Sequence, residues 1–101
     1  MKKLIRYTVK PDRAEENVEL VRAVYEELDR LQPEGVRYAT FRLDDGVSFV
    51  HVVSVETADG ESPLPGLPAF QRFQLGIAER CAEQPAVADL HEIGSYRLFG
   101  A

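Results

Sequence analysis

His51 is the residue of this chain best suited to acid–base chemistry. It lies in the apolar run 47–55, and because a histidine titrates near neutral pH, it would serve as a general base if it lined a cavity. No carboxylate nearby in the sequence would orient its ring. The simpler interpretation is a hydrogen-bonded histidine of the core or of an interface. His51 is therefore a candidate ligand-binding residue, and the catalytic residues stay unassigned.

Arg42 and Tyr38 are expected on the same side of a β-hairpin as His51. Residues 36–43 and 47–55 are rich in Val, Phe and Tyr and flank Asp44-Asp45-Gly46, which is typical of a hairpin. With Asp45-Gly46 as the turn, position 42 pairs with 49, 40 with 51 and 38 with 53. This register makes Tyr38, Arg42 and His51 one set of candidate ligand-binding residues. Arg42 would bind an anionic group of a ligand or form an ion pair with a second subunit.

Aromatic side chains are numerous enough to line a pocket for a small planar ligand. A compact core needs the same residue types, and burial in the core is the simpler interpretation. The residues concerned are Tyr7, Tyr38, Tyr96, Phe49, Phe70 and Phe73.

The sequence gives little support for a metal site or for a catalytic nucleophile. His91 stands near Asp89 and Glu92, but His51 and His91 are expected on strands separated by a third, roughly 10 Å apart, which is too far for one metal ion. Cys81, the only cysteine, lies in a helical pattern and is expected to be a buried, inert thiol. No phosphate loop or nucleophile elbow is present. We expect no metal and no cofactor.

Composition limits the partners. The 101 residues include 12 Lys and Arg against 17 Asp and Glu, a net charge of −5, which disfavours nucleic acid as a partner. No apolar run is long enough to cross a bilayer, and the N-terminus lacks the order of a signal peptide. We expect a single cytoplasmic domain over residues 1–101 with no membrane association.

The hydropathy pattern predicts six elements. A strand over 4–9 precedes a helix over 13–31, for which Asp12 and Glu15 form a capping box. The hairpin follows, and then an irregular connection over 57–68 that is the best candidate for a mobile flap. A second helix runs from 69 to Gln84-Pro85, and a last strand covers 87–99, with a bulge at Gly94.

This order is that of the α+β ferredoxin-like fold, βαββαβ, with a four-stranded antiparallel sheet. Its two helices cover one face of the sheet. Both faces of the predicted hairpin are apolar, so we expect a homodimer through the open sheet face, whichever face that is.

At this point the chain resembles the dimeric α+β barrel superfamily, and within it the small antibiotic biosynthesis monooxygenase-like proteins. The resemblance rests on the element order, on Tyr38-Ala39-Thr40-Phe41-Arg42 with its hairpin partner, and on the closing Ile93-Gly94-Ser95-Tyr96-Arg97-Leu98-Phe99. It implies a small aromatic ligand and, in some members, cofactor-independent oxidation by O2. A further branch degrades haem.

The polar residue sets of those enzymes do not carry over to this chain. The oxygenases use an Asn-Trp-Arg or similar set and the haem-degrading branch uses Asn, Trp and His, whereas this sequence has no tryptophan. Its only asparagine, Asn17, falls on the first helix rather than the first strand. The alternative to an oxygenase is a non-catalytic dimeric ligand-binding or regulatory module. A structural partner of a larger enzyme is compatible with the sequence, but no residue supports it.

Overall fold

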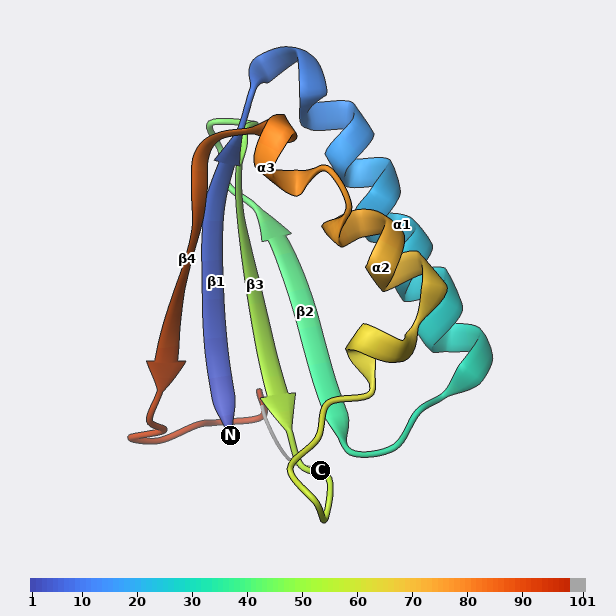
Figure 1. Ribbon diagram of the computed structural model, residues 1–101. Coiled ribbons are helices and arrows are strands. Elements are labelled where there is room, and N and C mark those ends of the chain that lie inside the picture. Colours follow the sequence, from blue (N-terminus) through green and yellow to red (C-terminus); the bar gives the residue numbers. More distant parts are fainter. Residues whose placement is uncertain (99–101) are drawn as a thin grey trace.

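The computed structural model describes residues 1–98 and has four strands and two main helices in the predicted order (Figure 1). The strands are β1 (Lys2–Val9), β2 (Val36–Arg42), β3 (Ser48–Val55) and β4 (Cys81–Leu90). The helices are α1 (Ala14–Leu31), α2 (Pro68–Gln74) and the single turn α3 (Ile77–Arg80). Short 3-10 turns η1 (Pro11–Arg13) and η2 (Leu64–Gly66) precede α1 and α2.

The strands form one antiparallel sheet in the order β2-β3-β1-β4, which confirms the α+β ferredoxin-like fold. The predicted hairpin register is also confirmed, since Arg42 pairs with Phe49, Thr40 with His51 and Tyr38 with Val53. As predicted, β1 separates β3, which contains His51, from β4, which ends just before His91. Within residues 1–98, no helix combines the length and apolar character that crossing a bilayer requires.

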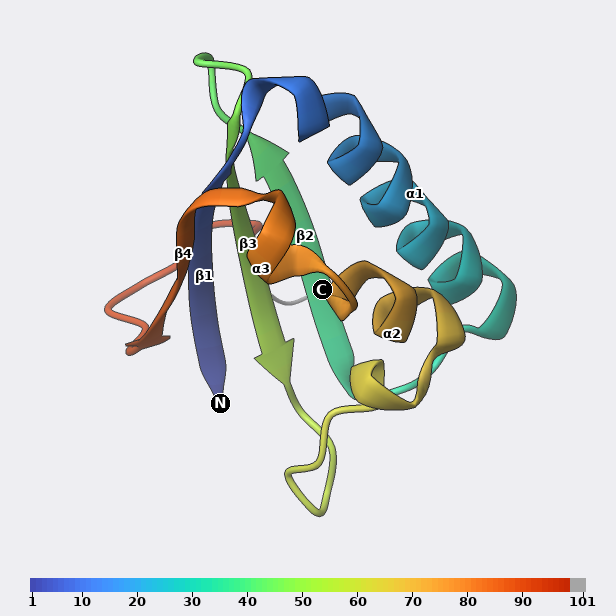
Figure 2. The same ribbon diagram turned by 45° about the horizontal axis from the view of Figure 1, so that its top comes forward.

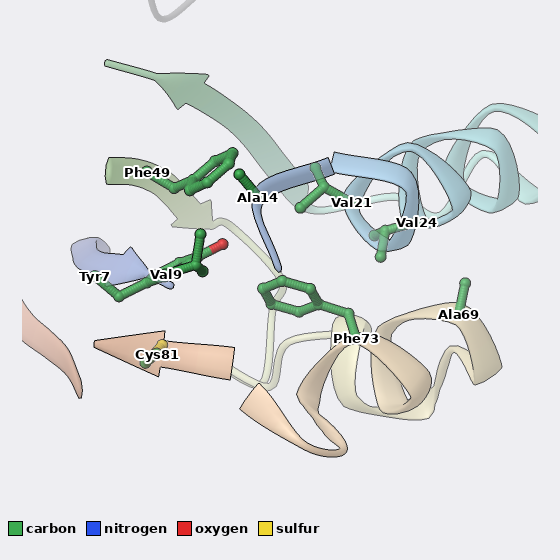
Figure 3. Close-up of a cluster of buried hydrophobic side chains, with 9 residues drawn as sticks. All are labelled: Tyr7, Val9, Ala14, Val21, Val24, Phe49, Ala69, Phe73 and Cys81. Atoms are coloured by element: carbon green, nitrogen blue, oxygen red, sulfur yellow. The ribbon is translucent and has the colours of Figure 1, made fainter. Parts of the chain in front are cut away.

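All three helices lie on one face of the sheet, which Figure 2 shows from a second angle. The main core forms between this face and the helices, and its side chains come from β1, β3, β4, α1 and α2 (Figure 3). Its buried residues are Tyr7, Val9, Ala14, Val21, Val24, Phe49, Ala69, Phe73 and Cys81. The six aromatic residues considered for a pocket all pack in or against this core except Tyr96, which is exposed. Tyr38 and Phe70 pack against it from outside.

The opposite face of the sheet carries no helix. On β2 and β3 its central side chains are apolar, at Ala39, Phe41, Val50 and Val52. Polar side chains lie toward the strand ends, at Arg37, Ser48 and Ser54. Phe41 is 55% exposed. We call the four apolar residues, together with Leu4 of β1, the open face.

The second helix is much shorter than predicted. Gly76 takes a left-handed φ of 79° after α2, and the chain enters β4 at Cys81 instead of after Pro85. A proline signals the end of a helix, but it is also tolerated in an edge strand, where its missing N–H breaks no ladder bond. β4 is such an edge, and its pairing with β1 shifts register between Arg6 and Thr8, close to Pro85.

The predicted last strand over 87–99 was therefore largely wrong. β4 ends at Leu90, and residues 91–98 are not in a strand, so Gly94 marks no bulge. Ile93 and Tyr96 are exposed, and residue 99 lies outside the described part of the chain. Leu98 lines a cavity of about 190 Å³ together with Phe41 and Val52, which places it beside the open face.

Two smaller predictions were also corrected. Asp12 lies within η1, and α1 begins without a side-chain cap, because a 3-10 turn occupies the place of the capping box. The connection over 57–68 is irregular at first, but η2 then buries Leu64 and Leu67 against Val53. A mobile flap here stays a prediction.

Candidate functional site

A chain of hydrogen-bonded polar side chains crosses the core. Its inner part begins at Arg80, whose Nε donates to Asn17 Oδ1 at 3.2 Å. Asn17 Nδ2 donates to the Tyr7 hydroxyl at 2.9 Å, and this hydroxyl lies 2.8 Å from His51 Nε2. All four side chains are buried, and they come from α3, α1, β1 and β3.

The outer part of the chain begins at the other ring nitrogen of His51. Nδ1 lies 2.7 Å from the Tyr38 hydroxyl and 2.9 Å from Thr40 Oγ1. Thr40 Oγ1 in turn lies 2.8 Å from the hydroxyl of Tyr25 on α1. The rings of Tyr25, Tyr38 and His51 stack in sequence, with centroids 5.4 and 5.7 Å apart. We call the complete chain, Arg80–Asn17–Tyr7–His51–Tyr38/Thr40–Tyr25, the polar relay.

Arg80 is a buried cation held by neutral groups. It is 1% exposed, and no carboxylate within residues 1–98 forms an ion pair with it. Its Nη1 and Nη2 donate to the backbone carbonyls of Leu75 and Phe73 at 3.2 and 2.7 Å, and its guanidinium lies 5.5 Å from the Phe73 ring centroid. Burial lowers the pKa of Arg80, but a guanidinium stays protonated in proteins.

Burial also determines the protonation of the other relay members. It lowers the pKa of His51 to about 4, and it raises the pKa of Tyr7 and Tyr25 to about 12 and that of Tyr38 further still. Desolvation disfavours every charged form, which is the common cause. At neutral pH, His51 and the tyrosines are therefore uncharged, and the relay offers a ligand hydrogen bonds rather than a strong base.

The relay reaches a groove between α1 and strands β2 and β3. This α1–β2 groove has a volume of about 320 Å³, within the usual range for small-molecule sites. Tyr25 and Thr40 of the relay belong to its lining. The complete lining is Val18, Val21, Arg22, Tyr25, Thr40, Arg42 and Phe49.

The two arginines of the groove form exposed ion pairs, and Arg42 Nε also donates to the Gly46 carbonyl at 2.8 Å. Arg42 pairs with Glu15 at 3.2 Å, and Arg22 pairs with Glu19 at 2.9 Å. All four side chains are at least 40% exposed, and exposed ion pairs contribute little to stability. Both guanidinium groups can therefore exchange their carboxylate for a ligand.

The structure brings two of the three candidate residues into contact. Tyr38 and His51 share a hydrogen bond, whereas Arg42 lies in the groove, which it shares with Thr40. His51 is 2% exposed, so it fits the interpretation as a hydrogen-bonded core histidine. Arg42 forms its ion pair within the chain, with Glu15 of α1.

Sequence reasoning missed most of the relay. Asn17 was considered only as a departure from the enzyme pattern, and Arg80 was not among the candidate residues. One signal was available: Asn17 stands three residues after Ala14 and four before Val21, on the apolar stripe of α1. A polar residue on such a stripe needs a buried partner.

Other candidate sites do not join the relay. A cavity of about 350 Å³ lies between the start of β1, the end of β3 and η2, and its lining includes Val53, Leu64 and Phe70. Cys81 is buried, as predicted, and burial raises the pKa of its thiol. His91 is exposed, also as predicted. Within the described range, no group of three or more His, Cys, Asp or Glu side chains is placed to hold a metal ion.

No protein-family model and no curated protein matches this sequence. Solved structures do match. One is a Nitrosomonas europaea protein with the provisional name antibiotic biosynthesis monooxygenase, at TM-score 0.73 and 18% identity, with 91% of this chain and 88% of that chain covered. Another, named antibiotic biosynthesis monooxygenase, has TM-score 0.72 and 19% identity over 93% of this chain and 100% of that chain.

A third similar structure is a Nitrosomonas europaea protein of unknown function, with TM-score 0.73 and 9% identity over 98% of this chain and 94% of that chain. The protein thus has the α+β fold of the antibiotic biosynthesis monooxygenase-like proteins, as the resemblance implied. At such identities the likeness concerns the fold, and function has to be argued from the site.

Proposed function

We propose that the protein is a homodimer that binds a small aromatic anion in the α1–β2 groove. The observation that carries this proposal is the composition of the groove, in which two arginines and the relay hydroxyls surround an apolar floor. Val18, Val21 and Phe49 would contact the flat face of an aromatic ring. Arg22 and Arg42 would bind its carboxylate or phenolate, since guanidinium groups suit planar anions.

Charge supports an anion in particular. The groove has two arginines in a chain of net charge −5, and an anionic ligand would replace the exposed glutamates, Glu15 and Glu19, that pair with them. The Arg42 guanidinium lies 5.9 Å from the centroid of the Phe49 ring, which keeps it close to the apolar floor. A ligand with an acidic group on one or two fused rings would satisfy both parts of the groove.

The second candidate function is oxidation of such a ligand by O2 without a cofactor, which the names of the similar structures favour. In that reaction an activated ring CH2 would become C=O and the second oxygen atom would leave as water, so no external reductant is needed. The reaction begins with removal of a substrate proton. A histidine whose pKa is about 4 is a weak base for this step, so the relay supports binding more strongly than it supports catalysis.

Ligand binding is tested with 2-naphthoate and the Arg42→Gln variant. We expect the substitution to weaken binding about tenfold, because one charge-assisted hydrogen bond is lost. Isothermal titration calorimetry measures the affinities. The matched control is Arg37→Gln, which removes a half-exposed arginine of the same strand that pairs with Glu56 away from the groove. Equal affinities of the wild type and Arg42→Gln would contradict the proposed site.

The homodimer is proposed to form through the open face. Phe41 is the most exposed large side chain there, and packing two apolar sheet faces together removes such surface from water. Leu98 lies beside Phe41 and would extend the interface.

We expect wild-type protein to have twice the 11.3 kDa chain mass in solution and Phe41→Asp to have the chain mass itself. A buried, unpaired carboxylate at the interface is the reason. Light scattering after size-exclusion chromatography measures both masses. Leu75→Asp, at a 77% exposed position next to α2, serves as the control and should leave the mass unchanged. A monomeric wild type would rule out the dimer.

A further inference from the structure

We infer that Arg80 and Asn17 set the direction of the hydrogen bonds from Arg80 to His51, so that the hydroxyls near the groove act as donors and select ligands with an anionic or carbonyl oxygen. The ligand part of this inference rests on the proposed function, whereas the direction of the relay does not. Arg80 and Asn17 are positioning residues, because they act on the groove only through Tyr7 and His51.

Arg80 determines the orientation of the Asn17 amide. A guanidinium has only donors, so the atom that faces Arg80 Nε at 3.2 Å must be the amide oxygen. The amide nitrogen then faces Tyr7, to whose hydroxyl it donates at 2.9 Å. Flipping the amide would place an NH2 group against a buried cation, which leaves this as the stable orientation.

The Asn17 amide in turn determines the tautomer of His51. The Tyr7 hydroxyl accepts from Asn17, so its single proton is free for His51 Nε2, 2.8 Å away. A neutral imidazole that accepts at Nε2 carries its proton on Nδ1. Arg80, two side chains removed from His51, therefore imposes the Nδ1–H form.

The tautomer determines what the hydroxyls near the groove can do. Because Nδ1–H donates, neither Tyr38 nor Thr40 can donate to His51, although both oxygens lie within 2.9 Å of Nδ1. Their protons must point elsewhere. Thr40 and Tyr25 share one hydrogen bond, which uses one of their two hydroxyl protons and leaves the other without an acceptor in this pair. Tyr25 and Thr40 line the groove, so an acceptor on the ligand completes the relay.

Asn17→Asp is the substitution that reverses the relay. The new carboxylate pairs with Arg80 and has a second oxygen toward Tyr7, and a carboxylate only accepts. The Tyr7 hydroxyl must then donate to this carboxylate, and it accepts from His51 Nε2–H. Nδ1 then accepts from Tyr38 or Thr40, and the groove loses one donor when Thr40, which lines it, takes this place.

The test is NMR spectroscopy of the ¹⁵N-labelled full chain, in which the imidazole nitrogen shifts report the tautomer of His51. We expect Nδ1–H in the wild type and Nε2–H in Asn17→Asp. Glu16→Gln, which removes a carboxylate that hydrogen-bonds to Arg13 and acts on Arg80 only through its charge, should keep Nδ1–H. An Nε2–H tautomer in the wild type overturns the inference, and this result needs no variant to fold. An unchanged Nδ1–H tautomer in a folded Asn17→Asp protein overturns it as well.

The ligand part is tested by calorimetry, comparing 2-naphthoate with 2-isopropenylnaphthalene, which has a similar shape but no acceptor oxygen. We expect the wild type to prefer 2-naphthoate through its arginines and the outward donor together, and Asn17→Asp to reduce this preference by up to about tenfold, since one outward donor is worth about that factor. A preference that is unchanged in Asn17→Asp overturns the role of the relay in selectivity. If the tautomers are as inferred but neither compound binds, the proposed function fails while the direction of the relay stands. If 2-naphthoate binds and the wild-type tautomer is Nε2–H, the proposed function stands while the direction of the relay fails.

Discussion

Tyr7→Phe is expected to lower the free energy of unfolding by about 2–4 kcal/mol, although it removes a single oxygen atom. That oxygen bonds to two buried groups, Asn17 Nδ2 and His51 Nε2, at 2.9 and 2.8 Å. Without it both groups lose a partner in a place where Asn17 is 0% and His51 2% exposed. The ring keeps its packing against Phe49 and Phe73, so the effect reports the hydroxyl alone.

Urea unfolding of the wild type and Tyr7→Phe measures this difference. Tyr96→Phe is the matched control, because it removes the same oxygen from a side chain that is 75% exposed, and it should change stability by less than about 0.5 kcal/mol. Equal effects of the two substitutions would show that the relay contributes nothing specific to stability.

Acidification is expected to remove about 3 kcal/mol of stability through His51 alone. Burial lowers the pKa of His51 from 6.5 to about 4, so between these values the unfolded chain binds a proton that the folded protein excludes. Stability therefore rises with pH across this window. The contribution of neutral His51 is complete above about pH 6.5 and is lost as the pH falls to about 4, at up to about 1.4 kcal/mol per pH unit.

Free energies of unfolding at several pH values from 7 to 4.5 test this dependence. His51→Gln is expected to have a flatter profile, because no imidazole titrates at this position, even though its stability at pH 7 is lower. His91→Gln removes the exposed histidine and should retain the wild-type slope. A wild-type profile that is flat between pH 6.5 and 5 would contradict a neutral, buried His51.

The first half of the fold was predictable because its signals are local. Asp44-Asp45-Gly46 marks the hairpin. The observed turn spans Leu43–Gly46, one residue earlier than predicted, but the register of β2 and β3 is the predicted one. The periodic apolar residues of α1 predicted a helix within one residue of its observed limits. These patterns depend on neighbours in the sequence, so no tertiary information was needed.

The second half was less predictable because tertiary contacts decide it. Residues 81–86 carry a proline and small or polar side chains, which favour neither helix nor strand. They form β4 because β1 offers a free edge, and an edge position tolerates Pro85. The apolar residues on both sides of Gly94 favoured the strand prediction, but Ile93 and Tyr96 are exposed in the structure.

The candidate site was predictable only in part. The hairpin register placed Tyr38, Arg42 and His51 on one face, and two of them do meet. Their further partners, Asn17 and Arg80, come from two helices whose approach to the sheet depends on the packing of the whole core. The sequence alone does not show that these two polar side chains are buried together, so it could not assign them to the site.

The central claim is that the α1–β2 groove binds an aromatic anion, and mapping 2-naphthoate on the wild-type protein by amide chemical shifts tests it most directly. We predict saturable shifts at Thr40, Arg42 and residues 18–25. Saturable shifts around Leu64 and Phe70 would instead assign the ligand to the second cavity. That result, or the absence of any saturable shift, would contradict the proposed site.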